Sequence, residues 1–85
     1  MIQKNVIVKL KTGLQSRPAA LFVQEANKFL SNIFVLQGNK KLNAKSVMGI
    51  MSLGLKPGAR ITITAEGPDE LEAVEQLDQM LVKNL

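Results

Sequence analysis

Histidine and cysteine are both absent from the 85-residue sequence. Without cysteine the chain has no disulfide bond, no thiol nucleophile and no thiolate metal ligand. Without histidine it lacks the commonest general base and transition-metal ligand, and it cannot form a phosphohistidine. We therefore expect a protein that is not an enzyme and that holds no resident metal or cofactor.

Aromatic residues and long apolar runs are also scarce. The chain has three phenylalanines and neither tyrosine nor tryptophan, which leaves no stacking platform for single-stranded nucleic acid. No apolar run is long enough to cross a bilayer, and the first residues alternate between polar and apolar instead of forming a signal peptide. We expect a single cytoplasmic domain, residues 1–85, with one modest core.

The net charge of +4 is unevenly distributed along the sequence. Residues 1–67 contain ten lysines and arginines against two acidic residues, whereas residues 68–85 contain one lysine against five acidic residues. Such asymmetry indicates a basic surface that meets an anionic partner, either nucleic acid or an acidic or phosphate-bearing protein. We favour the protein partner, because no nucleic-acid recognition motif is visible. A nucleic-acid binder would use the basic residues Lys9, Lys11, Arg17, Lys40, Lys41 and Lys45.

Hydrophobic periodicity predicts four strands and three helices in the order βαββαβα. The first strand falls in "IQKNVIVKL", where Val6, Val8 and Leu10 share one face. The first helix falls in "RPAALFVQEANKFL". Its predicted apolar stripe comprises Ala19, Phe22, Val23, Ala26 and Leu30.

A hairpin is expected over residues 33–43, with its turn at Gly38-Asn39. A short helix should then begin after a capping Ser46 and end at Gly54. The apolar residues at helical spacing in this segment are Val47, Ile50, Met51 and Leu55.

The last two elements are a strand and an amphipathic helix. Ile61 and Ile63 share one face of the strand in "ARITITAEG". The predicted stripe of the closing helix comprises Leu71, Val74, Leu77 and Leu81, and the acidic residues at its amino end are Asp69, Glu70 and Glu72. The order predicts an α/β (α+β) fold, an open-faced sandwich with a four-stranded antiparallel sheet and three helices on one face.

The stretch "KTGLQSRPAALFVQ", residues 11–24, is the first candidate site. Free backbone N–H groups at the start of a helix attract an anion, and Arg17 can bind one with two hydrogen bonds. Gln15 can only hydrogen-bond, because a side-chain amide cannot accept a phosphoryl group as an imidazole does. The same residues also fit an ordinary helix start with a solvated arginine.

The segment "NAKSVMGIM" is the second candidate site. A phosphate on Ser46 would add about −1.5 to −2 charges at the positive end of the helix dipole, which the fold should tolerate. Serine is also simply a favoured cap residue. Met48 and Met51 fit either a docking surface or ordinary packing.

Three segments carry a resemblance that covers essentially the whole chain: "GLQSRPAALFVQEA", "AKSVMGIMSLG" and "GARITITAEGPDELEAVEQL". They resemble HPr, the histidine-containing phosphocarrier family of the bacterial sugar phosphotransferase system. In ordinary members the position of Gln15 is the histidine that receives a phosphoryl group from enzyme I. The chain is similar to the branch of the family in which that histidine is a glutamine, the catabolite repression HPr-like proteins of bacilli.

The resemblance implies that phosphotransfer is lost while regulation is kept. It implies phosphorylation of Ser46 by HPr kinase/phosphorylase. The phosphoserine form would then bind a LacI-type catabolite control protein and promote its binding to operator DNA. The docking face implied by the resemblance comprises Gln15, Arg17, Val47, Met48 and Met51.

Two other classes of function make different demands on the residues. A constitutive binding or oligomerising module, such as a homodimer, could exchange the strand "NVIVKL" with a second copy if the region of Gly13 acts as a hinge. An enzyme would need a catalytic pair, but Glu25 and Glu66 lie in unrelated segments and Ser46 has no histidine base.

Overall fold

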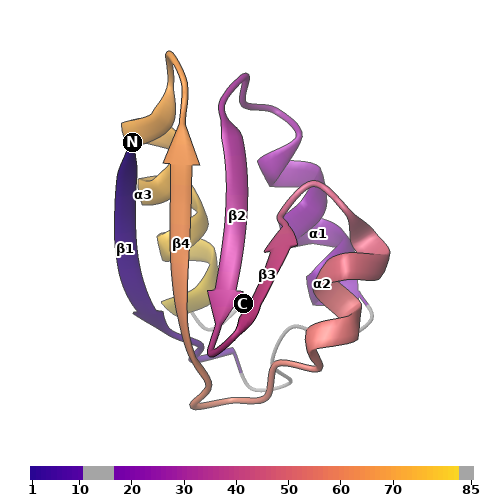
Figure 1. Cartoon of the computed structure of the whole chain (residues 1–85). Coiled ribbons are helices and arrows are strands. Elements are labelled where there is room, and N and C mark those ends of the chain that lie inside the picture. Colours follow the sequence, from indigo (N-terminus) through magenta and orange to yellow (C-terminus); the bar gives the residue numbers. More distant parts are fainter. Residues whose placement is uncertain (11–16, 83–85) are drawn as a thin grey trace.

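The elements follow one another in the predicted order βαββαβα (Figure 1). A computed structural model describes residues 1–10 and 17–82. The strands are β1 (Ile2–Ile7), β2 (Asn32–Gln37), β3 (Lys40–Asn43) and β4 (Arg60–Glu66). The helices are α1 (Arg17–Ala26), α2 (Val47–Leu53) and α3 (Glu70–Val82).

The four strands form one antiparallel sheet in the order β1-β4-β2-β3. β4 and β2 are therefore central, and β1 and β3 are edge strands. Figure 1 shows α3 behind β1 and β4, with α1 and α2 side by side next to β3. The predicted open-faced sandwich is confirmed. No helix within residues 1–10 and 17–82 is long and apolar enough to cross a membrane.

The core fills the space between the sheet and the helices. Val6 and Val8 from the first strand region and Ile61 and Ile63 from β4 are buried, as the alternation in the sequence predicts. The largest side chains with less than 2% of their surface exposed include Phe22, Ile33, Ile50, Leu55, Ile63, Leu77 and Leu81. One continuous cluster therefore joins every helix to the sheet.

The predicted stripe of the first helix is wrong at its last member. Leu30 is 80% exposed, and Phe29 takes the buried position instead. The cause is that α1 ends at Ala26, so the helical period does not extend to residue 30. The backbone N–H of Leu30 is instead held by Asp69.

The predicted stripe of the closing helix is wrong at its first member. Leu71 is 57% exposed, whereas Ala73 and Val74 are buried together with the predicted Leu77 and Leu81. Each residue of a helix turns by about 100°, which puts Leu71 to one side of the arc that these four share. The predicted stripe left out Ala73, which lies within this arc at four residues before Leu77.

Candidate functional site

Ser46 lies at the surface at the start of α2, where it caps the helix. Its side-chain oxygen accepts a hydrogen bond from the Gly49 N–H at 3.1 Å, and its carbonyl accepts from the Ile50 N–H at 3.0 Å. The helix ends at Gly54, whose backbone is left-handed with φ 56° and ψ 41°. Both predicted boundaries of the short helix are thus confirmed, and the Ser46 hydroxyl is held on ordered backbone.

The segment before Ser46 is tied to the end of α1 and the turn that follows it. The Lys45 ammonium donates to the Phe29 carbonyl at 2.7 Å, and the Asn27 amide donates to the Lys45 carbonyl at 3.4 Å. The Asn43 side chain accepts from the Lys45 N–H at 2.8 Å. These bonds hold the backbone that precedes Ser46 both to itself and to the end of α1.

An exposed apolar surface follows Ser46 along α2. Val47 is 40% exposed, Met48 84% and Met51 45%, whereas Ile50 and Leu53 are buried. Of the apolar residues that share helical spacing in this segment, Ile50 and Leu55 are buried, whereas Val47 and Met51 are exposed. A helix of seven residues contacts the core along one narrow side, and at about 100° per residue Val47, Met48 and Met51 fall together on the other. We call these three residues the α2 apolar patch.

Arg17 begins α1 and is exposed, as expected for an arginine in a first helical turn. α1 packs against α2, so Arg17 and the α2 apolar patch are on neighbouring helices. Leu21, one turn further along α1, is 42% exposed. The sequence reasoning missed Leu21, although its spacing of four residues from Arg17 could have indicated a shared helix face. Gln15 lies outside the described residues.

The stretch of sequence around Ser46 is basic and contains no acidic residue. No aspartate or glutamate occurs between Glu25 and Glu66. The ion pairs found within the described ranges join Met1 to Glu70, Lys4 to Asp78 and Lys28 to Glu25, and none of them includes a residue of α2 or of the segment before it. A new negative charge at Ser46 would therefore meet no acidic side chain of its own segment.

Asp69 is the one titratable group of the described chain whose pKa clearly departs from its ordinary value. A hydrogen bond from the Ser31 hydroxyl, and others from the Leu30 and Ser31 N–H groups, lower the pKa of this carboxyl below 3.8. These bonds link the turn after α1 to the start of α3. Asp69 therefore has a structural role at this junction.

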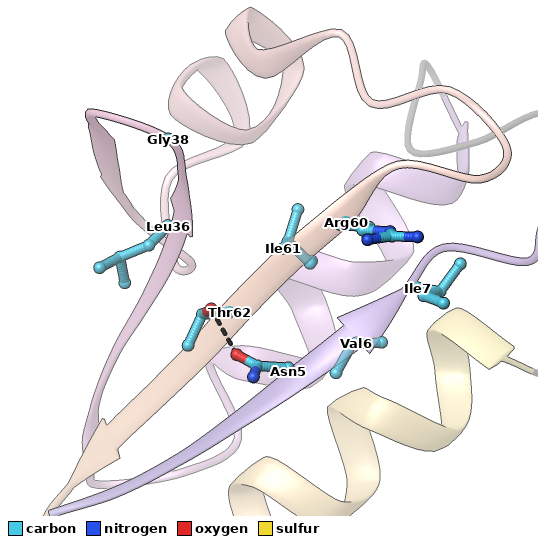
Figure 2. Close-up of a pocket in the computed structure, with 8 residues that line it drawn as sticks. All are labelled: Asn5, Val6, Ile7, Leu36, Gly38, Arg60, Ile61 and Thr62. Carbon is cyan, nitrogen blue, oxygen red and sulfur yellow. Dashed lines mark hydrogen bonds between the residues drawn. The ribbon is translucent and has the colours of Figure 1, made fainter.

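A hollow of about 510 Å³ lies on the open face of the sheet. Figure 2 shows Asn5 of β1 and Thr62 of β4 on its floor, joined by a hydrogen bond of 2.8 Å from the Thr62 hydroxyl. Arg60 and Ile7 line one end. None of the described residues predicted for a site borders the hollow. Within the described residues no cluster of three acidic, histidine or cysteine side chains could hold a metal ion.

Comparison with known proteins matches residues 2–83 to a family model described as PTS HPr component phosphorylation site. An HPr-like protein Crh of Halalkalibacterium halodurans is 59% identical over 98% of this chain and 99% of its own length. A crystal structure of the phosphocarrier protein HPr from Bacillus anthracis superposes with a TM-score of 0.92 at 57% identity, covering 94% of this chain and 95% of its own.

A crystal structure of Crh, the Bacillus subtilis catabolite repression protein, superposes with a TM-score of 0.79 at 53% identity. It covers 100% of this chain and 98% of that one, and is described as a dimer with a swapping domain.

Proposed function

The chain belongs to the HPr family, and from that premise we propose that it is a regulatory phosphoprotein of carbon catabolite repression and not a sugar-transport phosphocarrier. HPr kinase/phosphorylase phosphorylates Ser46, and the phosphoserine form acts as corepressor for a LacI-type catabolite control protein. The relatives named above are phosphocarrier and HPr-like proteins, which supports a role without enzymatic activity.

One observation carries this proposal: an exposed serine on a helix cap stands directly beside the α2 apolar patch. A phosphoryl group on Ser46 supplies charge and strong hydrogen-bond acceptors. The neighbouring Val47, Met48 and Met51 supply apolar contact area that water now covers. Charged groups beside apolar anchors are typical of the energetic centre of a protein interface.

The absence of histidine supports the loss of phosphotransfer. Gln15 stands where family members that carry phosphate have their acceptor histidine. An amide has no basic nitrogen to attack phosphorus, so the chain can bind at this position but cannot relay a phosphoryl group. The stretch around Arg17 then serves recognition alone.

Phosphorylation changes the surface and leaves the core alone. Ser46 is exposed and makes no contribution to the buried cluster, so added charge there costs no burial. Each charge-assisted hydrogen bond from an arginine or lysine of the partner contributes about 1.5–3 kcal/mol. One or two such bonds tighten binding by between about tenfold and about four orders of magnitude, which is sufficient for a switch.

The first test incubates the purified chain with an HPr kinase/phosphorylase and ATP and reads the mass and the modified residue by mass spectrometry. We expect one phosphate, on Ser46. Ser46→Ala should take none, while Ser52→Ala, which alters a serine of the same helix, should be modified like the unaltered chain. A phosphate on another residue, or an unmodified chain under conditions that modify an HPr, would contradict the proposal.

Assembly is a second proposal. β1 is an edge strand that pairs with β4 alone in the sheet, and the similar Crh structure of Bacillus subtilis is described as a swapped dimer. We propose that this chain also forms homodimers by exchanging β1. Such a dimer is compatible with regulation through Ser46, because β1 lies at the opposite edge of the sheet from β3, against which α2 packs.

A further inference from the structure

Gly49 occupies an interior position of α2 where a glycine is unfavourable. It follows the capping Ser46 by three residues and is not among the glycines with positive φ, so its backbone does not require glycine. A glycine inside a helix costs about 0.5–1 kcal/mol relative to alanine. Its presence here needs another reason.

The position of Gly49 relative to the helix cap makes a glycine there unexpected for a second reason. The third residue after a serine cap is commonly glutamate or glutamine, whose side chain returns to the N–H of the cap. In this chain the Ser46 N–H instead donates to the Asn43 carbonyl at 3.1 Å. A side chain at position 49 is therefore compatible with a capped helix, and the fold alone does not exclude it.

The space beside Ser46 supplies the reason. A Cβ atom at position 49 would lie 3.3 Å from the Ser46 oxygen, which is tighter than most Cβ contacts, and 3.4 Å from the Ser46 Cβ. The next nearest atom, the Asn43 carbonyl oxygen, would be 3.7 Å away. Glycine at this position thus leaves free the space on one side of the Ser46 oxygen, the atom that must form a bond to phosphorus.

We propose that Gly49 is a positioning residue for the modification of Ser46, because its missing side chain keeps room for the phosphoryl group. This inference rests on the proposed function. In the transfer, the Ser46 oxygen attacks the γ-phosphorus of ATP, the bond from that phosphorus to the bridging oxygen breaks, and ADP leaves. The hydroxyl proton passes to a base of the kinase. Glycine also keeps this position uncharged, whereas a glutamate would repel the incoming phosphate.

The test compares Gly49→Ala and Gly49→Glu with the unaltered chain as substrates of HPr kinase/phosphorylase and ATP. We expect Gly49→Ala to keep its melting temperature and its KM while kcat for phosphorylation falls at least about tenfold, equivalent to about 1.4 kcal/mol on the barrier. Gly49→Glu should remain folded, because glutamate has a higher helix propensity than glycine, and it should lose more activity. Ser52→Ala, which raises helix propensity without adding an atom near Ser46, should behave like the unaltered chain.

Separate outcomes distinguish failure of this inference from failure of the proposed function. An unaltered chain that takes no phosphate overturns both. If the unaltered chain is modified, a kcat for Gly49→Ala within twofold of it overturns the role of Gly49 alone. A rise confined to KM would assign Gly49 to kinase docking, and a large fall in melting temperature would assign it to the fold. Either result would also overturn the inference.

Discussion

Asp69 shows how one side chain can join two separate parts of the chain. Its carboxylate accepts hydrogen bonds of 2.9 Å and 3.0 Å from the Leu30 and Ser31 N–H groups, as well as one from the Ser31 hydroxyl. Ser31 is buried, and a Cβ at Gly67 would come within 2.6 Å of it, so the turn after α1 and the turn before α3 are tightly apposed. The charged form of Asp69 is the form that these donors favour.

This arrangement predicts a specific acid sensitivity. Because the folded pKa of Asp69 lies below its ordinary value of 3.8, its stabilisation is complete above that value and declines as the pH falls through the folded pKa. Asp69→Asn should lower the melting temperature at pH 7 and flatten its fall between pH 5 and pH 2. Thermal unfolding followed by circular dichroism across that range measures both effects. Parallel curves for the two proteins would contradict this role.

Among the elements, α2 best separates what local sequence determines from what the tertiary fold determines. Its ends were predictable, because a capping serine and a left-handed glycine act through bonds to the helix itself. Helical spacing alone did not predict its exposed side, since Val47 and Met51 are as apolar as buried residues; the resemblance to the family had placed both on a docking face. Which apolar residues of so short a helix stay exposed depends on which side of the helix packs against the core.

The two longer helices, α1 and α3, also differ between what the sequence predicts and what only the structure shows. Phe22, Val23, Val74 and Leu77 were predictable from periodicity, because α1 and α3 are long enough to maintain it. The prediction for Leu30 was wrong because this residue lies beyond the end of α1. The prediction for Leu71 was wrong because this residue lies outside the buried side of α3. The sequence was sufficient to name Ser46, Arg17 and the residues of the α2 apolar patch as members of the candidate site. The structure was needed to show that these side chains are exposed.

The edge strand β1 allows a direct test of strand exchange. Asn5 and Thr62 are opposite each other on β1 and β4, and the chain has no cysteine of its own. A protein carrying Asn5→Cys and Thr62→Cys should form a disulfide-linked dimer on oxidation if β1 is exchanged, because the two strands then belong to different chains. Non-reducing gels with light scattering measure it. A cross-linked species of monomer mass at every concentration would contradict exchange.

Across the whole molecule, ion pairs between elements partly offset the charge asymmetry of the sequence. The acidic residues of α3 are partly neutralised, since Glu70 pairs with the amino terminus and Asp78 pairs with Lys4. The long stretch from β2 to β4, which contains Ser46, has lysines and no acidic residue before Glu66. A phosphate on Ser46 would therefore place negative charge in a stretch of sequence that has no acidic residue of its own. That contrast is suited to a partner that must distinguish two states.

The measurement that tests the switch most directly is calorimetric titration of a LacI-type catabolite control protein with the phosphorylated and unphosphorylated chain. The account predicts that phosphorylation of Ser46 tightens binding by about tenfold or more, the effect of one charge-assisted hydrogen bond. It also predicts that Arg17→Ala weakens binding of the phosphorylated form while its melting temperature stays unchanged, because Arg17 is exposed. Equal affinities of the two forms for the repressor would contradict the account.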